Sequence, residues 1–241
     1  MAGIGSVFPK SRLSGSLMIN SEIDKSSLNS ANKVKDNMII EVGGNKDFET
    51  IQSAIDSLPR TLTEDTTILV YPGKYKEDVK ISNIKGQALI IKGIKNEIEN
   101  TSVMNIRCYD IQGLVQINNL RFVWSDQINL DTSKSILLFS RCSYASIDYL
   151  KFVGKTKISN VPTIQFDGST GAVHNSYFHN QKTCIFSKNG SQVRVDGNNT
   201  HSNLASTYFL FSQSAVIYYT GKVKLPAATK NKEYKAGRIF T

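Results

Sequence analysis

Apolar and polar residues alternate along most of the chain in short runs, a pattern that predicts β-strands. Asn, Gly and Ser fall between the runs at nearly every break, where they favour tight turns. The predicted strands are MIIEV, TTILVYPG, KEDVKIS, ALIIKGI, LVQINNLRFV, SILLFSRC, SIDYLKFVG, TIQFDG, AVHNSYF, CIFSK, QVRVDG, YFLFS and AVIYYTGKVKL. So many short strands indicate a sandwich, a barrel or a solenoid.

One segment near the start of this region has helical period instead. Residues 47–58 follow a Gly-Gly turn, with Asp47 placed as the N-cap and Pro59 as the stop. The apolar residues of the segment share one helical face and are Phe48, Ile51, Ala54, Ile55 and Leu58. A helix with one apolar face is suited to cover the open end of a strand array.

The strands repeat in register, which separates a solenoid from a sandwich. Residues 117–122 align with 147–152 at a shift of 30, and a further shift of 26 brings residues 173–178. Other equivalent positions are Leu138 with Ile164, Val173 with Val195, and Val195 with the strand at Val216 and Ile217. A loose period of 21 to 30 residues is too short for propeller blades, and the leucine-rich consensus is missing. The repeat predicts stacked turns whose strands pair in parallel, about 4.8 Å apart.

The run from Asp47 to Ile94 resembles the opening of the pectate-lyase-like right-handed parallel β-helix superfamily. The resemblance is carried by DFETIQSAIDSLP, by ILVYPGKYKEDVKI with its Pro-Gly-x-Tyr turn, and by ALIIKGI. Pectin methylesterases and many bacteriophage tail spikes, tail fibres and tail appendages begin in this way. The resemblance implies an all-β fold, a right-handed parallel β-helix (solenoid) with an N-terminal capping α-helix.

Charge and composition divide the chain into three parts. Residues 1–38 are predicted to be a flexible N-terminal arm for attachment, residues 39–220 the β-helix domain, and residues 221–241 a basic C-terminal strand and tail. The net charge is +9, of which +5 lies in residues 221–241 and +2 in residues 1–38. The predicted domain therefore lacks a basic stripe, and nucleic-acid binding is not expected. The basic C-terminal segment is a candidate contact for a neighbouring subunit or an anionic cell wall.

Several classes of protein and site are not supported. No run of 18 apolar residues occurs, so membrane insertion is not expected, and the first 20 residues lack the apolar centre of a secretory signal. Cys108, Cys142 and Cys184 are widely spaced and are interpreted as buried free thiols. His174, His179 and His201 lack metal-ligand spacing, and phosphate-binding and nucleophile motifs are missing. No metal or cofactor is predicted.

The alignment places four polar residues in one column, which we call the polar column: Asn118, Asp148, His174 and Asp196. Each follows an inward apolar residue and should point outward. Asp148 and Asp196 would then stand about 9 to 10 Å apart, at the long edge of the ~6.5–9.5 Å that inverting glycosidases use. Asp148, His174 and Asp196 are therefore a candidate catalytic face. The alternative is ordinary solvated surface, because the outside of a β-helix must be polar.

Four other residues are candidates for binding a glycan. Arg121 and Lys151 lie three positions along from the polar column and could attract an acidic sugar. Tyr149 and Tyr177 could stack on a pyranose, and Asn118 could add a hydrogen bond. Aromatic residues also stack inside β-helices and at subunit contacts, which is the alternative. Glu77 and Asp78 belong to the opening that carries the resemblance and are interpreted as structural.

The resemblance extends to fold more than to activity. A DFIFG-like esterase run is missing, since IQFDG at 164–168 and VRVDG at 193–197 each supply a single Asp before Gly. We therefore expect a structural or receptor-binding component of a bacteriophage tail, contacting the host cell-surface glycan and other tail or baseplate proteins. Such a component is made in the host cytoplasm without a signal peptide and resides in the virion. The resemblance implies a homotrimer. The alternatives are a polysaccharide depolymerase, either glycoside hydrolase or lyase, and a cell-encoded β-helical protein.

Overall fold

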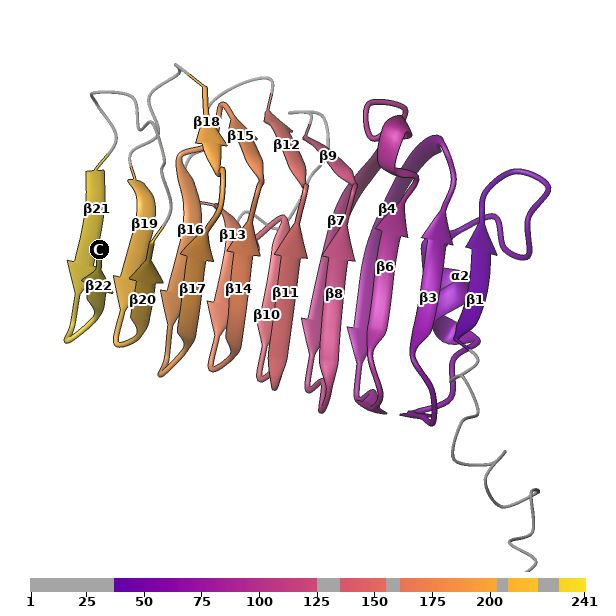
Figure 1. The fold of residues 1–241 in the computed structure, drawn as a ribbon, viewed down its shortest axis with the longest axis horizontal. Coiled ribbons are helices and arrows are strands. Elements are labelled where there is room, and N and C mark those ends of the chain that lie inside the picture. Colours follow the sequence, from indigo (N-terminus) through magenta and orange to yellow (C-terminus); the bar gives the residue numbers. More distant parts are fainter. Residues whose placement is uncertain (1–36, 125–134, 155–160, 203–207, 221–229) are drawn as a thin grey trace, which may run out of the picture. The chain divides into compact units, whose positions relative to one another are not determined.

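The chain forms a parallel β-solenoid in which each turn stacks on the one before it (Figure 1). The computed structural model describes residues 37–124, 135–154, 161–202, 208–220 and 230–241. Most of the predicted arm, residues 1–36, lies outside the described residues. No helix in the described part of the chain is long and apolar enough to cross a membrane.

One wall of the solenoid is a sheet that contains nine strands of the described residues, in chain order from one edge to the other. We call it the nine-stranded sheet. Its strands are β1 (Met38–Val42), β3 (Thr66–Val70), β6 (Leu89–Gly93), β8 (Leu114–Asn118), β11 (Tyr144–Asp148), β14 (Thr170–His174), β17 (Gln192–Asp196), β20 (Val216–Tyr219) and β22 (Arg238–Phe240).

The other strands of the described residues form a larger sheet of eleven strands and a pair. The eleven-stranded sheet contains β4 (Gly73–Ser82), β7 (Thr101–Tyr109), β9 (Arg121–Trp124), β10 (Leu137–Ser140), β12 (Lys151–Gly154), β13 (Pro162–Asp167), β15 (Tyr177–His179), β16 (Thr183–Lys188), β18 (Thr200–His201), β19 (Tyr208–Gln213) and β21 (Lys230–Tyr234). The pair is β2 (Thr61–Leu62) with β5 (Lys85–Gly86), and a short 3-10 helix, η1, spans Lys95–Glu97.

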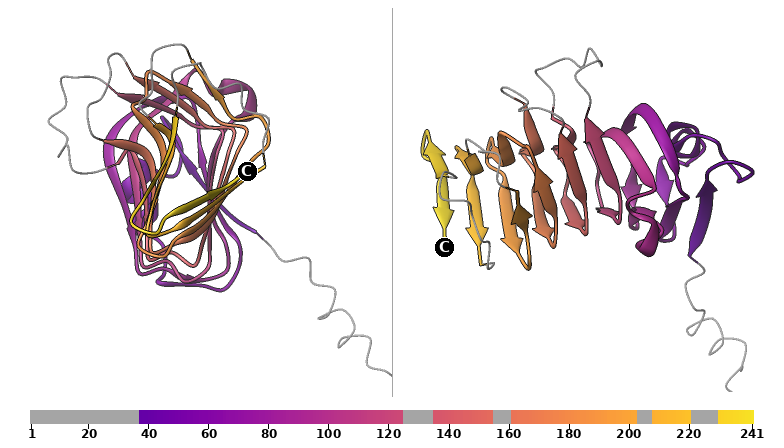
Figure 2. Two further views of the ribbon diagram at one scale, coloured as in Figure 1. Left: turned by 90° about the vertical axis from the view of Figure 1, so that its left-hand side faces the viewer. Right: turned by 90° about the horizontal axis from the view of Figure 1, so that it is seen from above.

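The long strand β7 shows that the eleven-stranded sheet covers two sides of each turn. The first part of β7 pairs with β9, and its last part pairs with β10. Every ladder among the described strands is parallel. Viewed along the stack, successive turns superpose (Figure 2). The predicted fold class, an all-β parallel solenoid, is confirmed.

Most of the predicted register is confirmed, with two corrections. Ile117 pairs with Ile147, and Ile147 pairs with Val173. The pairing of Leu138 with Ile164 was wrong by one residue, because Leu137 is the partner of Ile164. The strand at Val216 is shifted by two residues from its predicted place, since Val193 and not Val195 lies opposite Ile217.

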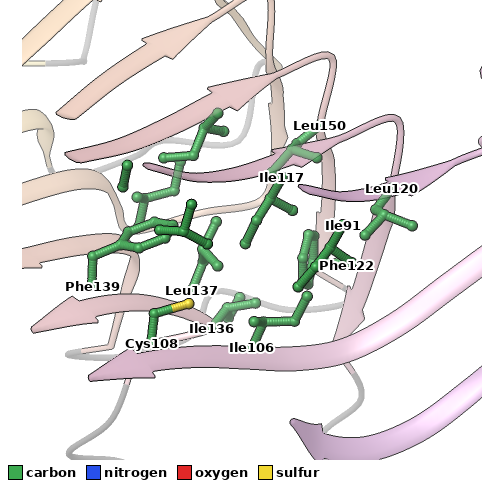
Figure 3. Close-up of a cluster of buried hydrophobic side chains, with 14 of the residues drawn as sticks. Ile91, Ile106, Cys108, Ile117, Leu120, Phe122, Ile136, Leu137, Phe139 and Leu150 are labelled. Atoms are coloured by element: carbon green, nitrogen blue, oxygen red, sulfur yellow. The ribbon is translucent and has the colours of Figure 1, made fainter. Parts of the chain in front are cut away.

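Inward side chains of successive turns stack into a continuous apolar core (Figure 3). The rings of Phe122, Phe152 and Phe178 form one such stack, with centroids 5.1 and 5.2 Å apart. All three rings are buried, as are the three free cysteine thiols. Stacking of equivalent residues follows from the parallel register, because each turn places the same position above its predecessor.

The predicted helix is present as α2 (Ile51–Asp56), but it is shorter than residues 47–58. The N-cap is Thr50, whose side chain accepts from the Ser53 amide, and the predicted Asp47 cap was wrong. Residues 46–48 instead fold back on β1, where Asp47 accepts a hydrogen bond from the Glu41 amide at 2.9 Å. Glu77 accepts from the amides of Ile51 and Gln52, at 2.8 and 2.9 Å, which gives it the structural role expected of it.

The C-terminal segment joins the two sheets. Of residues 221–241, the structure describes 230–241, and these contain β21 and β22, the last strand of the eleven-stranded and of the nine-stranded sheet. Exposed aromatic side chains lie on both strands, with Tyr234 on β21 and Phe240 on β22.

A single left-handed residue forms the turn after each of four strands of the nine-stranded sheet. These residues are Asn119, Tyr149, Asn175 and Gly197, with φ of 53°, 50°, 42° and 69°. Asn and Gly tolerate this conformation well, whereas a bulky side chain rarely adopts it. Tyr149 is therefore the unusual member of the set, and it lies directly after Asp148.

Candidate functional site

The predicted polar column is brought together on the outer face of the nine-stranded sheet. Asn118 pairs with Asp148, Asp148 with His174, and His174 with Asp196 along β8, β11, β14 and β17. Each follows a fully buried residue, so the period of two directs all four side chains outward. All four are half-buried, because the neighbouring turns shield each side chain.

Asp196 is the centre of a cluster of three charged or polar side chains. One carboxylate oxygen forms a hydrogen bond with Nδ1 of His174, and the other forms an ion pair with Nε of Arg194 at 2.8 Å. Because a carboxylate oxygen accepts, Nδ1 of His174 is the donor and Nε2 is the ring's remaining hydrogen-bonding atom. The side chain of Arg194 is 58% exposed, and that of Asp196 is 24% exposed. The Arg194 guanidinium therefore faces solvent, whereas the Asp196 carboxylate is shielded.

Asp148 is held by a different neighbour. Nδ2 of Asn175 donates to its carboxylate at 2.9 Å, and Oδ1 of the same amide accepts from the Asn198 backbone at 3.0 Å. The left-handed turn at Asn175 therefore links the carboxylate of one turn to the backbone of the next. At the other end of the polar column, the side-chain oxygen of Asn118 is buried and has no hydrogen-bond partner.

An aromatic pair extends this face toward the C-terminal end of the sheet. Arg194 pairs with Tyr218 of β20, and Tyr218 pairs with Phe240 of β22. The rings of Tyr218 and Phe240 are stacked, with centroids 5.5 Å apart and an interplanar angle of 17°. The side chains are 47% and 52% exposed, respectively. Flat, exposed rings thus continue the outward column that contains Arg194.

The predicted cationic residues Arg121 and Lys151 lie on the adjacent wall, around the turn from the polar column. They pair with each other in register on β9 and β12, and Lys151 pairs with Tyr177 of β15. Both cations are bound by Glu99. Arg121 donates to the Glu99 carbonyl at 3.1 Å, and the ammonium of Lys151 forms an ion pair with the carboxylate.

The structure therefore separates these two cations from the polar column and neutralises part of their charge. Lys151 also lies 5.6 Å from the ring centroid of Tyr177. Tyr149 lies in the turn between the two walls and is 52% exposed. Of the predicted glycan-binding residues, Tyr149 is the one placed next to the polar column with a free aromatic surface.

The cluster at Asp196 can bind and orient polar groups. An arginine beside a carboxylate and an imidazole offers donors and acceptors at fixed positions, which suits sugar hydroxyls or carboxylates. A histidine whose Nδ1 is held by a carboxylate can also move a proton through Nε2. No group of three or more His, Cys, Asp or Glu residues within the described ranges could hold a metal ion.

Sequence reasoning missed the residues that complete this face. Arg194 is two positions before Asp196, and the alternation in QVRVD places both on one side of the strand. That signal was present and could have found Arg194. Phe240 could also have been found, because it follows Tyr218 by 22 residues, a shift that lies within the loose period of 21 to 30.

No protein-family model matches the chain, and no curated protein matches it. Among solved structures, the chain is similar to the pectin methylesterase from Aspergillus niger in a penultimately deglycosylated form, with 13% identity and a TM-score of 0.42. That match covers 82% of this chain and 84% of the other. The deglycosylated form of the enzyme matches with 13% identity and a TM-score of 0.41, over 81% and 84% of the two chains. These values are too low to transfer an activity or a site to this chain.

Proposed function

We propose that the protein is a structural, receptor-binding component of a bacteriophage tail, either a fibre, a spike or a baseplate appendage. In this proposal it binds a glycan of the host envelope through the outer face of the nine-stranded sheet. The observation that carries the proposal is the exposed Tyr218–Phe240 stack beside Arg194, whose guanidinium is oriented by Asp196. The resemblance of the chain's opening to tail proteins supports the placement in a virion.

The chemistry of this face suits a sugar ligand. Aromatic rings that lie flat bind the apolar side of a pyranose and lose few rotamers on binding. Arg194 lies on β17, the strand next to Tyr218, and His174 lies on β14, one strand further along the sheet. Both can bond hydroxyl or carboxylate groups of an extended ligand. A repeating wall also presents equivalent positions turn after turn, which fits a polymer better than a small metabolite.

The contacts of the carboxylates favour binding over catalysis. Both oxygens of Asp196 are occupied, by His174 and Arg194, and Asp148 accepts from Asn175. A hydrolytic pair needs one carboxyl group to donate a proton and the other to activate water or attack. Asp148 and Asp196 are separated by the turn that carries His174 and are each held by side chains of the wall itself.

Binding is tested by titrating the protein with surface polysaccharides from a panel of bacteria. The variants Arg194→Ala and Tyr218→Ala should each weaken binding about tenfold or more, since each removes a main contact of the ligand. Tyr234→Ala is the matched control, because Tyr234 is 48% exposed but lies on the eleven-stranded sheet. Equal affinity of all the variants and the wild type would refute the proposed binding face.

The second candidate is a polysaccharide depolymerase or lyase, and one observation favours it. His174 is hydrogen-bonded to Asp196 in the same column as Asp148, an arrangement able to transfer a proton. If so, the protein releases reducing ends or an unsaturated product from a polysaccharide, and Asp148→Asn or Asp196→Asn abolishes the release. Binding without product formation supports the structural role.

The proposed trimer is tested separately by mass. A virion component of this kind should have three times the mass of one chain at micromolar concentration. A strictly monomeric species would count against the proposed place in a tail.

A further inference from the structure

A hollow of about 460 Å³ lies on a different side of the solenoid from the polar column. It is lined by Arg60, Asn83, Ile84, Lys85, Asp110 and Gln112, where β4 and β7 end and β5 begins. Its volume falls in the range of small-ligand sites, about 300–1,000 Å³. A smaller hollow of about 120 Å³ shares Arg60 and Ile84 with it and continues toward α2.

Main-chain hydrogen bonds fix the walls of this hollow. The amide of Lys85 donates to the Arg60 carbonyl at 3.0 Å, and the amide of Gln112 donates to the Ile84 carbonyl at 2.9 Å. The backbone amide of Asn83 donates to the Tyr109 carbonyl at 3.1 Å. The hollow is therefore formed before any ligand arrives, which lowers the entropy lost on binding.

The cations of the hollow are not neutralised by its carboxylate. Asp110 is bound through both oxygens by Arg141, at 2.6 and 2.8 Å, and this hydrogen-bonded pairing lowers the pKa of Asp110. Arg60 donates to a neutral acceptor, the Ser82 carbonyl, at 2.5 Å. Within the described part of the chain, Lys85 makes no ion pair. Arg60 and Lys85 thus leave an excess of positive charge at a polar hollow.

We infer that this hollow binds an anionic saccharide unit, through Arg60 and Lys85 on its carboxylate or phosphate and through Asn83 and Gln112 on its hydroxyls. A guanidinium anchored by one arm can still present its other N–H groups to a planar or tetrahedral anion. Side-chain amides supply both donors and acceptors. Ile84 is the one apolar residue of the lining and is itself buried, so an apolar ligand does not fit.

This inference deepens the proposed function by naming the class of glycan. It rests on the proposed function only in taking the saccharide to be part of a bacterial surface glycan. Uronic acids and sugar phosphates share the required chemistry. Ligand-observed NMR with galacturonate and with glucose 6-phosphate distinguishes a uronic acid from a sugar phosphate, and neutral glucose is the control. At least one anion should bind ten or more times tighter than glucose, and the tighter of the two identifies the source. Raising the salt concentration should weaken that binding.

Variants locate the site. Arg60→Gln and Lys85→Ala should each weaken anion binding about tenfold, the loss expected for one charge-assisted contact. Lys74→Ala is the matched control, since Lys74 is an exposed lysine at the other end of β4. If the Arg60→Gln variant does not fold, Lys85→Ala keeps the test valid, because the Lys85 side chain is exposed.

Each other outcome overturns the inference in a recognisable way. Equal binding of glucose, or unchanged binding by both variants, refutes an anion site in the hollow. If Arg194→Ala removes anion binding and Arg60→Gln does not, the ligand binds on the nine-stranded sheet, so the inference fails and the proposed function stands. If no anion binds, the inference fails, and the polysaccharide titration alone decides the proposed function.

Discussion

Replacing Tyr149 by Asn should stabilise the protein. Tyr149 has a φ of 50°, and three equivalent turns use Asn119, Asn175 and Gly197 instead. The left-handed conformation costs an ordinary L residue about 1–2 kcal/mol, and Asn adopts it more readily. Because Tyr149 is 52% exposed, its ring loses little buried contact on replacement. The free energy of unfolding should rise by about 0.5–1 kcal/mol.

This gain is measurable as a shift of the melting temperature. For a domain of this size, 1 kcal/mol corresponds to about 2–4 °C, so Tyr149→Asn should raise Tm by about 1–4 °C. Tyr144→Asn is the control, because Tyr144 is an exposed tyrosine in the extended strand β11 and gains nothing from Asn. If Tyr149→Asn lowers Tm, or raises it no more than the control does, the strain at Tyr149 is refuted. A stabilised variant with weaker glycan binding would show that the strained tyrosine serves recognition.

Three other perturbations have defined outcomes. Phe152→Ala removes the middle ring of a buried three-ring stack and should cost about 3–5 kcal/mol, read from the urea midpoint; a loss below about 1 kcal/mol would contradict the packing. Arg141 lowers the pKa of Asp110 from its usual 3.8, so the pair stabilises the fold above that pH and ceases to do so as the pH falls through the lowered value. Thermal melts of Arg141→Ala and wild type should therefore differ at pH 7 and converge in acid, whereas a constant difference would argue against the pair. Burial raises the pKa of Cys108, and that of Cys142 to about 11, so neither thiol should react with a disulfide reagent at pH 8 until denaturant is added; rapid labelling of the native protein would be inconsistent with their burial.

The sequence was sufficient to predict the strand register where apolar and polar residues alternate. Ile117 and Ile147 each sit between two polar residues, so the period of two fixes which side chains point inward and hence the register. Alternation is missing in residues 136–139, which are all buried, and there the predicted pairing of Leu138 slipped by one. A continuous apolar run does not specify which of its residues faces the core.

The candidate site was predictable only in part, for a physical reason. Stacking of Asp148, His174 and Asp196 follows from register alone, and the structure confirms it. Side-chain partners do not follow from register. Asp148 is bound by Asn175 from a turn residue, and Lys151 by Glu99, which is 52 positions earlier in the chain. Such contacts depend on where loops and turns place side chains, and a repeat pattern carries no information about that.

The repeat nonetheless explains how a short stretch of chain can build an extended outer face. Each turn adds one strand to the nine-stranded sheet, so residues from β14, β17, β20 and β22 lie side by side although they span most of the C-terminal third of the chain. His174, Arg194, Tyr218 and Phe240 are brought together in this way. A change of one side chain in this wall should alter recognition without disturbing the core behind it.

The central claim is that the outer face of the nine-stranded sheet binds a bacterial surface glycan. Titration of the double variant Arg194→Ala/Tyr218→Ala against the polysaccharide that binds the wild type tests it most directly. The account predicts that binding falls by at least the tenfold expected of either single variant, while Tm stays within a few degrees of the wild type. Undiminished binding by a folded double variant would contradict it.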